Sequence, residues 1–398
     1  MARTELNDAT DATGSRLAAW AAGFGLLVVG AHLFLTPHDW STLYLRDLKV
    51  YQSAVDAFAA GGDPYPPAQA RRAHGLFFTS PPFVWLLFKL VAHSPLRPVF
   101  GPLLLAADAI SVVAIPVVLS RLLLGPSAAR AALGVGFFFT AFAGAGFFTA
   151  LVINNGTPLY ALIAAALIPA MSRGRWLWFH LAVTLATAFK PFYAAFWIVP
   201  LLADGPWGRR WAASAVGLLA AASTYVAPLL IAPKLMSLWV HTLFRQTMGE
   251  GLLGDNLLGA VLTEPIARQS HAIAYAAQLA FSAALLVGAL TLGRLDRPRR
   301  IAALVLIAVF LNPRAMRYDL STAAVPLLAL VAGAFFRGPP SPMAQAAWAI
   351  ALASVMIIFS RSTPADGFLY AGLAVAALLG AIGASYAAGW SSVARRGR

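Results

Sequence analysis

Long apolar segments alternate with short polar turns along this 398-residue chain. About 20 predominantly apolar residues in helical conformation are enough to cross the hydrocarbon core of a bilayer. From the spacing of these segments we predict an all-α polytopic membrane protein with about 12 transmembrane helices. The predicted spans cover residues 17–35, 81–93, 99–124, 131–153, 159–171, 176–203, 211–231, 271–292, 301–311, a segment that ends at 336, 344–359 and 367–387.

The first long polar interruption, residues 36–80, differs from the other turns because part of it has a helical pattern. Residues 47–60 lack Pro and Gly, and their apolar positions fit an amphipathic helix that lies on a membrane surface. The sequence GGDPYPP then places two Gly and three Pro close together, which predicts the end of that helix. Three of the few carboxylates of the chain lie here: Asp47, Asp56 and Asp63.

An even number of spans places both termini in the cytoplasm. Residues 1–16 are then a cytoplasmic tail, residues 17–398 form one transmembrane domain, and loops 36–80, 233–270 and 312–318 share the outer face. The basic turns after residues 205, 293 and 336 fall inside, as the positive-inside rule expects. Arg121, Arg130, Arg173 and Arg175 fall outside on this count, so one of spans 2 to 6 is either re-entrant or miscounted, and the side of Asn154 is left open.

Composition supports a membrane protein: 60% of the residues are hydrophobic and only 11% are charged. The net charge of +14 comes mostly from arginines scattered among the spans, which does not favour nucleic-acid binding. There is no Cys, so disulfides and thiolate chemistry are excluded. The seven His residues form no metal-binding motif, and we expect neither a metal nor a cofactor.

Two positions stand out as candidates for chemistry. Asp47 begins the predicted amphipathic helix and shares a face with Tyr51, one turn later, whereas Asp56 lies on the opposite face. The alternative for either aspartate is a plain surface charge. Lys190 is followed by Pro191 in the middle of an apolar segment, where a lysine is costly and normally faces a cavity or an anionic partner. Its alternative is a lysine that extends to the interface.

Further polar residues cluster in the two later loops. Arg314 and Arg317 are three residues apart and suit bidentate phosphate recognition, with Tyr318 and Asp319 beside them. A structural Arg–Asp pair, or a cytoplasmic position of this turn, is the alternative. His241 and Arg245 share a face if their stretch is helical, as site residues or interfacial anchors. Asn154 and Asn256 complete the set of polar candidates for substrate binding.

In order along the chain, these motifs resemble glycosyltransferase family 87. The resemblance rests on D-x-x-x-Y at 47–51, A-G-G-D-P-Y at 60–65, F-x-x-x-P-P at 77–82, N-G-T-P-L at 155–159, Lys190-Pro191 and N-P-x-x-x-R-Y at 312–318. Thr157 stands where the family usually has Gln, and Arg317 where many members have His. The resemblance implies a GT-C fold and a sugar donor carried on a polyprenyl phosphate.

The family resemblance implies a function as well. The expected enzyme moves a sugar, mannose or another hexose, from polyprenyl phosphate to a lipid-linked or cell-envelope glycan acceptor, with inversion, at the outer (periplasmic) face of a bacterial inner membrane. Asp47 matches the general base of the class. Lys190, Arg245, Arg314 and Arg317 would bind the donor phosphate, and the candidates for substrate binding are Tyr51, Asn154, His241, Asn256, Tyr318 and Asp319. A transporter or flippase of a lipid-linked sugar and an arabinofuranosyltransferase are the alternatives.

Overall fold

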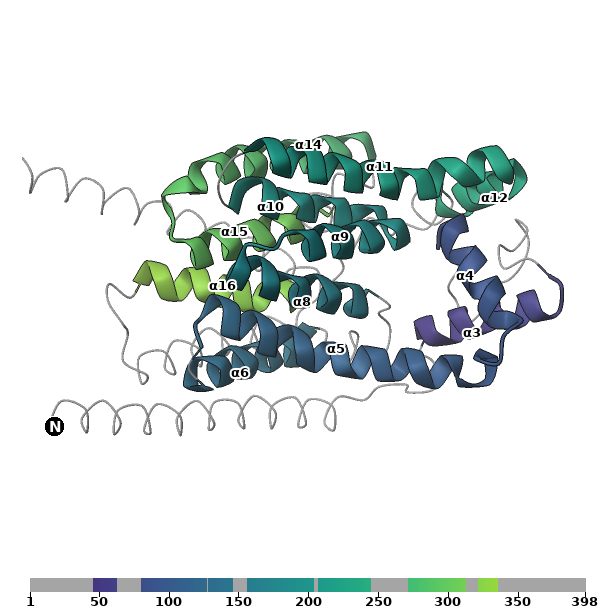
Figure 1. The fold of residues 1–398 in the computed structure, drawn as a ribbon, viewed down its shortest axis with the longest axis horizontal. Coiled ribbons are helices and arrows are strands. Elements are labelled where there is room, and N and C mark those ends of the chain that lie inside the picture. The colour runs from purple at the N-terminus through teal and green to yellow at the C-terminus, as the bar shows by residue number, and fades with distance from the viewer. Residues whose placement is uncertain are drawn as a thin grey trace, which may run out of the picture.

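The computed structural model describes residues 46–62, 80–126, 128–145, 156–203, 207–244, 271–312 and 321–335. Within these ranges the chain is all-helical and has no strand. The elements are α3 Arg46–Ala59, α4 Pro82–Ala92, η1 Arg97–Val99, α5 Phe100–Leu123, α6 Ala128–Ala145, α8 Thr157–Arg173, α9 Leu177–Phe189, η2 Pro191–Trp197, α10 Ile198–Ala203, α11 Trp207–Ile231, α12 Pro233–Phe244, α14 His271–Leu290, η5 Thr291–Arg294, α15 Arg297–Phe310 and α16 Ser321–Phe335 (Figure 1). The predicted tail 1–16 and the predicted spans 17–35, 344–359 and 367–387 lie outside the described residues.

Two helical segments of the described part are long and apolar enough to cross a membrane. They are Arg97–Leu123, which includes α5, and Gly208–Ile231, which is most of α11. Both coincide with predicted spans. α11 lies on the outside of the bundle, with only 11% of its most apolar window buried, and it exposes large side chains such as Leu219, Leu230 and Ile231. Exposed apolar surface of this extent is typical of a membrane or partner interface.

The centre of the bundle is α15. Asp296 caps its N-terminus by accepting a hydrogen bond from the backbone N–H of Arg299 at 3.0 Å, and Pro298 occupies the first turn, where no intrahelical donor is needed. Every residue from Ile301 to Phe310 is buried. α15 packs against α16, α10 and η2, and is therefore the helix around which the main core is built.

α5 and α6 form an antiparallel hairpin held at very short range. A Cβ added to Gly134 on α6 would overlap the Oγ and Cβ atoms of Ser120 on α5. Small residues at such positions allow two backbones to approach closely. Helices in lipid depend on this close packing, because lipid is as apolar as they are and the hydrophobic effect does not drive them together. Gly134 is therefore a close-packing position between α5 and α6.

A smaller apolar cluster closes one end of the bundle, which we call the cap end and define by α3, α4 and α12, on the right of Figure 1. α3 buries its apolar face, with Val50, Ala54, Val55 and Phe58, against α4. The predicted helix and its stop are confirmed: α3 ends at Ala59, and Gly61 adopts a φ of 78°, which favours glycine. Its position on a membrane surface stays a prediction, since the apolar face packs on α4.

Segment 81–93 does not cross the bundle, which corrects the predicted second span. α4 has 11 residues, equal to about 16 Å of helix, against about 30 Å for a bilayer core. A turn at 93–96 leads to η1, whose Arg97 pairs with Asp56 on α3 at 3.0 Å. α4 therefore begins and ends at the cap end, where α5 also begins.

Segment 176–203 reverses its direction at Lys190, which corrects the predicted continuous sixth span. α9 ends at Phe189, Lys190 is extended, and η2 and α10 return alongside α9. The C-terminal end of α10 is held by two arginines from other helices. Arg210 of α11 donates to the carbonyl of Pro200 at 3.3 Å, and Arg300 of α15 donates to that of Ala203 at 2.8 Å. Lys190 is thus at the tip of a hairpin, away from its two ends.

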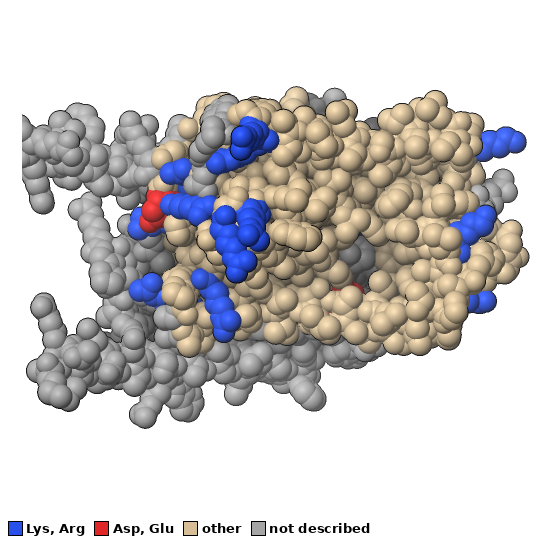
Figure 2. Space-filling view, in the orientation of Figure 1, with Lys and Arg blue, Asp and Glu red and all other residues tan. Residues whose placement is uncertain are grey.

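These two changes gather the arginines at the end opposite to the cap, which we call the arginine end. It comprises the C-terminal ends of α5, α8 and α10 and the N-terminal ends of α6, α9, α11 and α15. Figure 2 shows Lys and Arg side chains concentrated over this end, with fewer at the other. The four arginines that the predicted count left on the side of α3 lie here instead: Arg121, Arg130, Arg173 and Arg175.

Candidate functional site

The candidate site is at the cap end, where α3 carries Asp47 and Tyr51. Asp47 is the second residue of α3; its side chain is outside the described part. Tyr51, one turn further, is half-buried and meets the ring of Phe88 edge-on, with ring centroids 5.1 Å apart. The face of α3 that carries these two residues is therefore adjacent to α4.

Asp56 lies on the exposed side of α3, as its position on the helix predicts. Its Oδ1 accepts a hydrogen bond from Arg97 Nη2 at 3.0 Å, and its side chain is 50% exposed. Asp56 is therefore a surface charge with a basic partner, which is the alternative given above for either aspartate. Asp63, the third carboxylate of the predicted loop, lies outside the described residues.

Lys190 occupies a break between helices and not the middle of one. Its φ and ψ of −144° and 115° are extended, and Pro191 begins η2 directly after it. The lysine side chain is half-buried, with Nζ 5.9 Å from the centroid of the Phe192 ring. A lysine at a helix break, partly covered by aromatic groups, is less solvated than a surface lysine, which strengthens its attraction for an anion.

The break at Lys190 is stabilised by Tyr225 from α11. Pro191 has no N–H, so the carbonyl of Thr187, four residues earlier, loses its helical donor. The hydroxyl of Tyr225 donates to that carbonyl at 2.7 Å and approaches the carbonyl of Ala188 at 3.2 Å. The carbonyl that the proline frees is thus satisfied by a tyrosine of the protein itself.

α4 links Lys190 to α3. Phe189, which precedes the lysine, meets Phe83 of α4 edge-on with centroids 6.2 Å apart. Trp239 of α12 is buried in the same cluster and lies 5.9 Å from the ring of Tyr225. The structure thus brings the helix of Asp47, the break at Lys190 and the start of α12 to one end of the molecule.

His241 is also at this end, in the last turn of α12, and its side chain is exposed. The described chain continues to Asn312, which is buried beyond the end of α15 that lies away from the arginine end. The remaining predicted site residues lie outside the described residues: Asn154, Arg245, Asn256, Arg314, Arg317, Tyr318 and Asp319. The described residues contain no group of three metal-ligating side chains, and the expected independence from metal stays a prediction.

Sequence reasoning missed Asp108, a carboxylate eight residues into α5 from the cap end. It lies inside the apolar segment Arg97–Leu123, its side chain is half-buried, and its Oδ1 atom is fully buried. The signal was present in the sequence, because an acidic residue inside an apolar span normally faces a cavity or a polar partner. Asp108 therefore joins Asp47 as a carboxylate of the cap half of the bundle.

In comparisons with known proteins, no family model, no curated protein and no solved structure matches this chain. The resemblance to glycosyltransferase family 87 therefore rests on the sequence motifs alone and stays a prediction.

Proposed function

We propose that this protein is an integral-membrane, inverting glycosyltransferase of the GT-C class. It transfers a sugar, mannose or another hexose, from a polyprenyl-phosphate donor to a lipid-linked or cell-envelope glycan acceptor. Its site is the cap end, with Asp47 as general base and Lys190 as a phosphate-binding cation.

One observation carries this proposal beyond the order of the motifs. Asp47 and Lys190 are 143 positions apart in sequence, yet α3 and the break at Lys190 both pack against α4. A base and a cation must act on opposite sides of the same anomeric carbon, one on the acceptor hydroxyl and the other on the departing phosphate. This chemistry requires the base and the cation to lie at the same end of the bundle, and α3 and the break at Lys190 do so.

The distribution of arginines supports an orientation. Cytoplasmic ends of membrane spans are enriched in Lys and Arg, so we place the arginine end in the cytoplasm and the cap end outside, in a bacterial inner membrane. α4 and the hairpin at Lys190 both depart from the predicted order of spans. The count of about twelve, with both termini inside, stays a prediction.

In the proposed reaction, the Asp47 carboxylate accepts the proton of the acceptor hydroxyl as that oxygen attacks the anomeric carbon. The bond between the anomeric carbon and the phosphate oxygen breaks, and its electron pair leaves with the polyprenyl phosphate. Lys190, with Arg245, Arg314 and Arg317 as further candidates, stabilises the negative charge on that phosphate. A phosphate leaving group needs no protonation, so one carboxylate suffices.

The test compares two aspartates on the same helix. Asp47→Asn in the purified full chain, supplied with polyprenyl-phosphate mannose and a lipid-linked glycan extract, is expected to lower turnover by about 10²–10⁴, the usual contribution of a general base. Asp56→Asn is the matched control, because Asp56 is exposed and its contacts with Arg97 and Gln52 lie on the surface. It should retain wild-type turnover within about twofold.

Turnover of the Asp47→Asn enzyme near the wild-type rate would remove Asp47 from the proposal. Lipid-linked sugar that moves across the bilayer of protein-containing vesicles, with no new glycosidic product, would favour a flippase instead. The use of polyprenyl-phosphate arabinofuranose in place of a hexose donor would keep the reaction class and change the sugar.

A further inference from the structure

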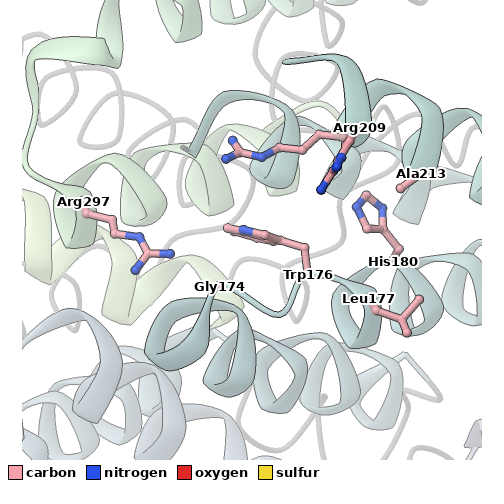
Figure 3. A pocket seen from close by; sticks show the side chains of 8 residues that line it. Gly174, Trp176, Leu177, His180, Arg209, Ala213 and Arg297 are labelled. Carbon is pink, nitrogen blue, oxygen red and sulfur yellow. The ribbon is translucent and has the colours of Figure 1, made fainter. Parts of the chain in front are cut away.

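A cavity of about 600 Å³ lies at the arginine end, far from the proposed site. Four helices contribute to it: the C-terminal end of α8 and the first turns of α9, α11 and α15. Its lining residues are Gly174, Trp176, Leu177, His180, Arg209, Arg210, Ala213 and Arg297, which Figure 3 shows from close by.

The cavity is strongly basic. Three arginines line it, and no acidic side chain is among the described residues that do so. Arg297 is held in place by donating to the carbonyls of Met171 at 2.7 Å and Ala170 at 3.1 Å. The nearest carboxylate in sequence, Asp296, pairs with Arg299 instead. The N-termini of α9, α11 and α15 add the partial positive charge of their unpaired backbone N–H groups.

A buried histidine points to a ligand independently of the arginines. His180 is only 6% exposed, and its Nδ1 atom has no hydrogen-bond partner within the described part of the chain. In Figure 3 its ring projects from α9 toward α11, the helix of Arg209. A buried polar atom without a partner is costly, and a ligand that supplies the missing hydrogen bond would remove that cost.

The cavity opens beside an exposed apolar surface. Leu177 is both a lining residue and 66% exposed, and the neighbouring side chains Trp178, Leu181 and Trp211 are at least half exposed. Tryptophan and arginine side by side at the end of an apolar bundle are typical of the headgroup level of a membrane. A ligand here can place an anionic group among the arginines while its apolar part lies along α9 and α11.

We propose that this cavity binds the phosphate group of an anionic phospholipid. Arg209 and Arg210 of α11 and Arg297 of α15 contact the phosphate oxygens, and His180 contributes a hydrogen bond. The acyl chains of the lipid then lie on the exposed apolar faces of α9 and α11. The site is separate from the proposed transferase site and does not depend on it.

The experiment uses the purified full chain in detergent micelles with an equimolar mixture of phosphatidylglycerol and phosphatidylcholine. Native mass spectrometry counts the lipids retained. Wild-type protein is expected to retain phosphatidylglycerol in preference, and Arg209→Gln to weaken that retention about fivefold, the effect of one basic residue beside an anionic lipid. Arg121→Gln is the matched control, because Arg121 is exposed at the same end but does not line the cavity. It should retain wild-type preference.

The variants must keep the wild-type unfolding temperature in phosphatidylcholine alone, which separates lipid binding from folding. Equal retention of the two lipids, or equal losses in Arg209→Gln and Arg121→Gln, would overturn the proposal in favour of a diffuse surface charge. A separate arm adds inorganic phosphate without lipid. Displacement of phosphatidylglycerol by low millimolar phosphate, dependent on Arg209, would show that the cavity takes a free anion and would overturn the lipid assignment.

Discussion

The two ends of the bundle are held together by different interactions. At the arginine end, guanidinium groups bind backbone carbonyls of other elements: Arg297 reaches the end of α8, and Arg300 reaches the carbonyls of Ala203, Gly293 and Leu295. At the cap end, edge-on aromatic contacts join the helices, as between Phe88 and Tyr51 and between Phe83 and Phe189.

This difference has a physical reason. The carbonyls at a helix C-terminus lack intrahelical donors and carry partial negative charge, so an arginine that binds them satisfies several groups in fixed geometry. Aromatic contacts are less directional and allow helices to shift. The arginine end is therefore suited to serve as a rigid scaffold, and the cap end as the part that can adapt to a substrate.

Arg300→Gln is the largest test of this comparison. The side chain donates to three carbonyls from two segments, α10 and η5 with its C-cap, and hydrogen bonds of charged groups contribute about 1.5–3 kcal/mol each, less where water reaches them. We expect the variant to lower the free energy of unfolding by about 3 kcal/mol. Reversible unfolding of the purified protein in mixed micelles, at increasing denaturing detergent, measures this change.

Arg300→Lys sharpens the result, because it keeps the charge but not the planar fork of donors. We expect a loss between that of the Gln variant and zero. A Lys variant as stable as the wild type would show that positive charge at the helix ends suffices. The description of the arginine end as a scaffold held by hydrogen bonds would then be wrong.

Tyr225→Phe tests the polar contact that stabilises the break at Lys190, at the cap end. The variant leaves the carbonyl of Thr187 without the donor that replaces the missing N–H of Pro191, at an expected cost of about 1.5 kcal/mol. If Lys190 binds the donor phosphate, the looser break should also raise the KM for the lipid donor several-fold. Ser223→Ala is the matched control: its hydroxyl bonds only within the exposed surface of the same helix.

An unchanged KM in Tyr225→Phe, together with a loss of stability, would assign the tyrosine to the fold alone. A Ser223→Ala variant as damaged as Tyr225→Phe would show that any lost hydroxyl on α11 has this effect, and the specific role at the break would be refuted.

The sequence predicted where helices lie far better than how they are connected in space. Apolar length alone located α5 and α11 to within a few residues of 99–124 and 211–231. It did not show that 176–203 turns back, because an apolar run reads the same whether it continues or reverses. The available signals were local: the short length of α4, and Lys190-Pro191 inside an apolar run. Four misplaced arginines also indicated an error in this region.

For the candidate site, the sequence predicted elements more successfully than contacts. The amphipathic helix with Asp47 followed from helical periodicity, and the missing N–H of Pro191 implies a carbonyl at Thr187 without its helical donor. The partner of that carbonyl, Tyr225, lies 38 residues from Thr187, and its position is decided by packing that no local pattern encodes. The basic cavity escaped notice for the same reason, since its arginines come from two different helices.

Arg97→Gln gives the smallest expected effect and is the direct counterpart of Arg300→Gln. The Arg97–Asp56 pair is short, at 3.0 Å, but its side chains are 45% and 50% exposed, so water screens the attraction and its loss should cost only about 0.5 kcal/mol. A double-mutant cycle with Asp56→Asn isolates the pair, and the coupling should vanish in about 1 M salt, where the screening length is only about 3 Å. If Arg97→Gln instead destabilises the protein as much as Arg300→Gln, and does so at every salt concentration, the cap end is also held by a fixed polar contact. The distinction between a rigid arginine end and an adaptable cap end would then be refuted, since Arg97 joins α3 to the segment that begins α5.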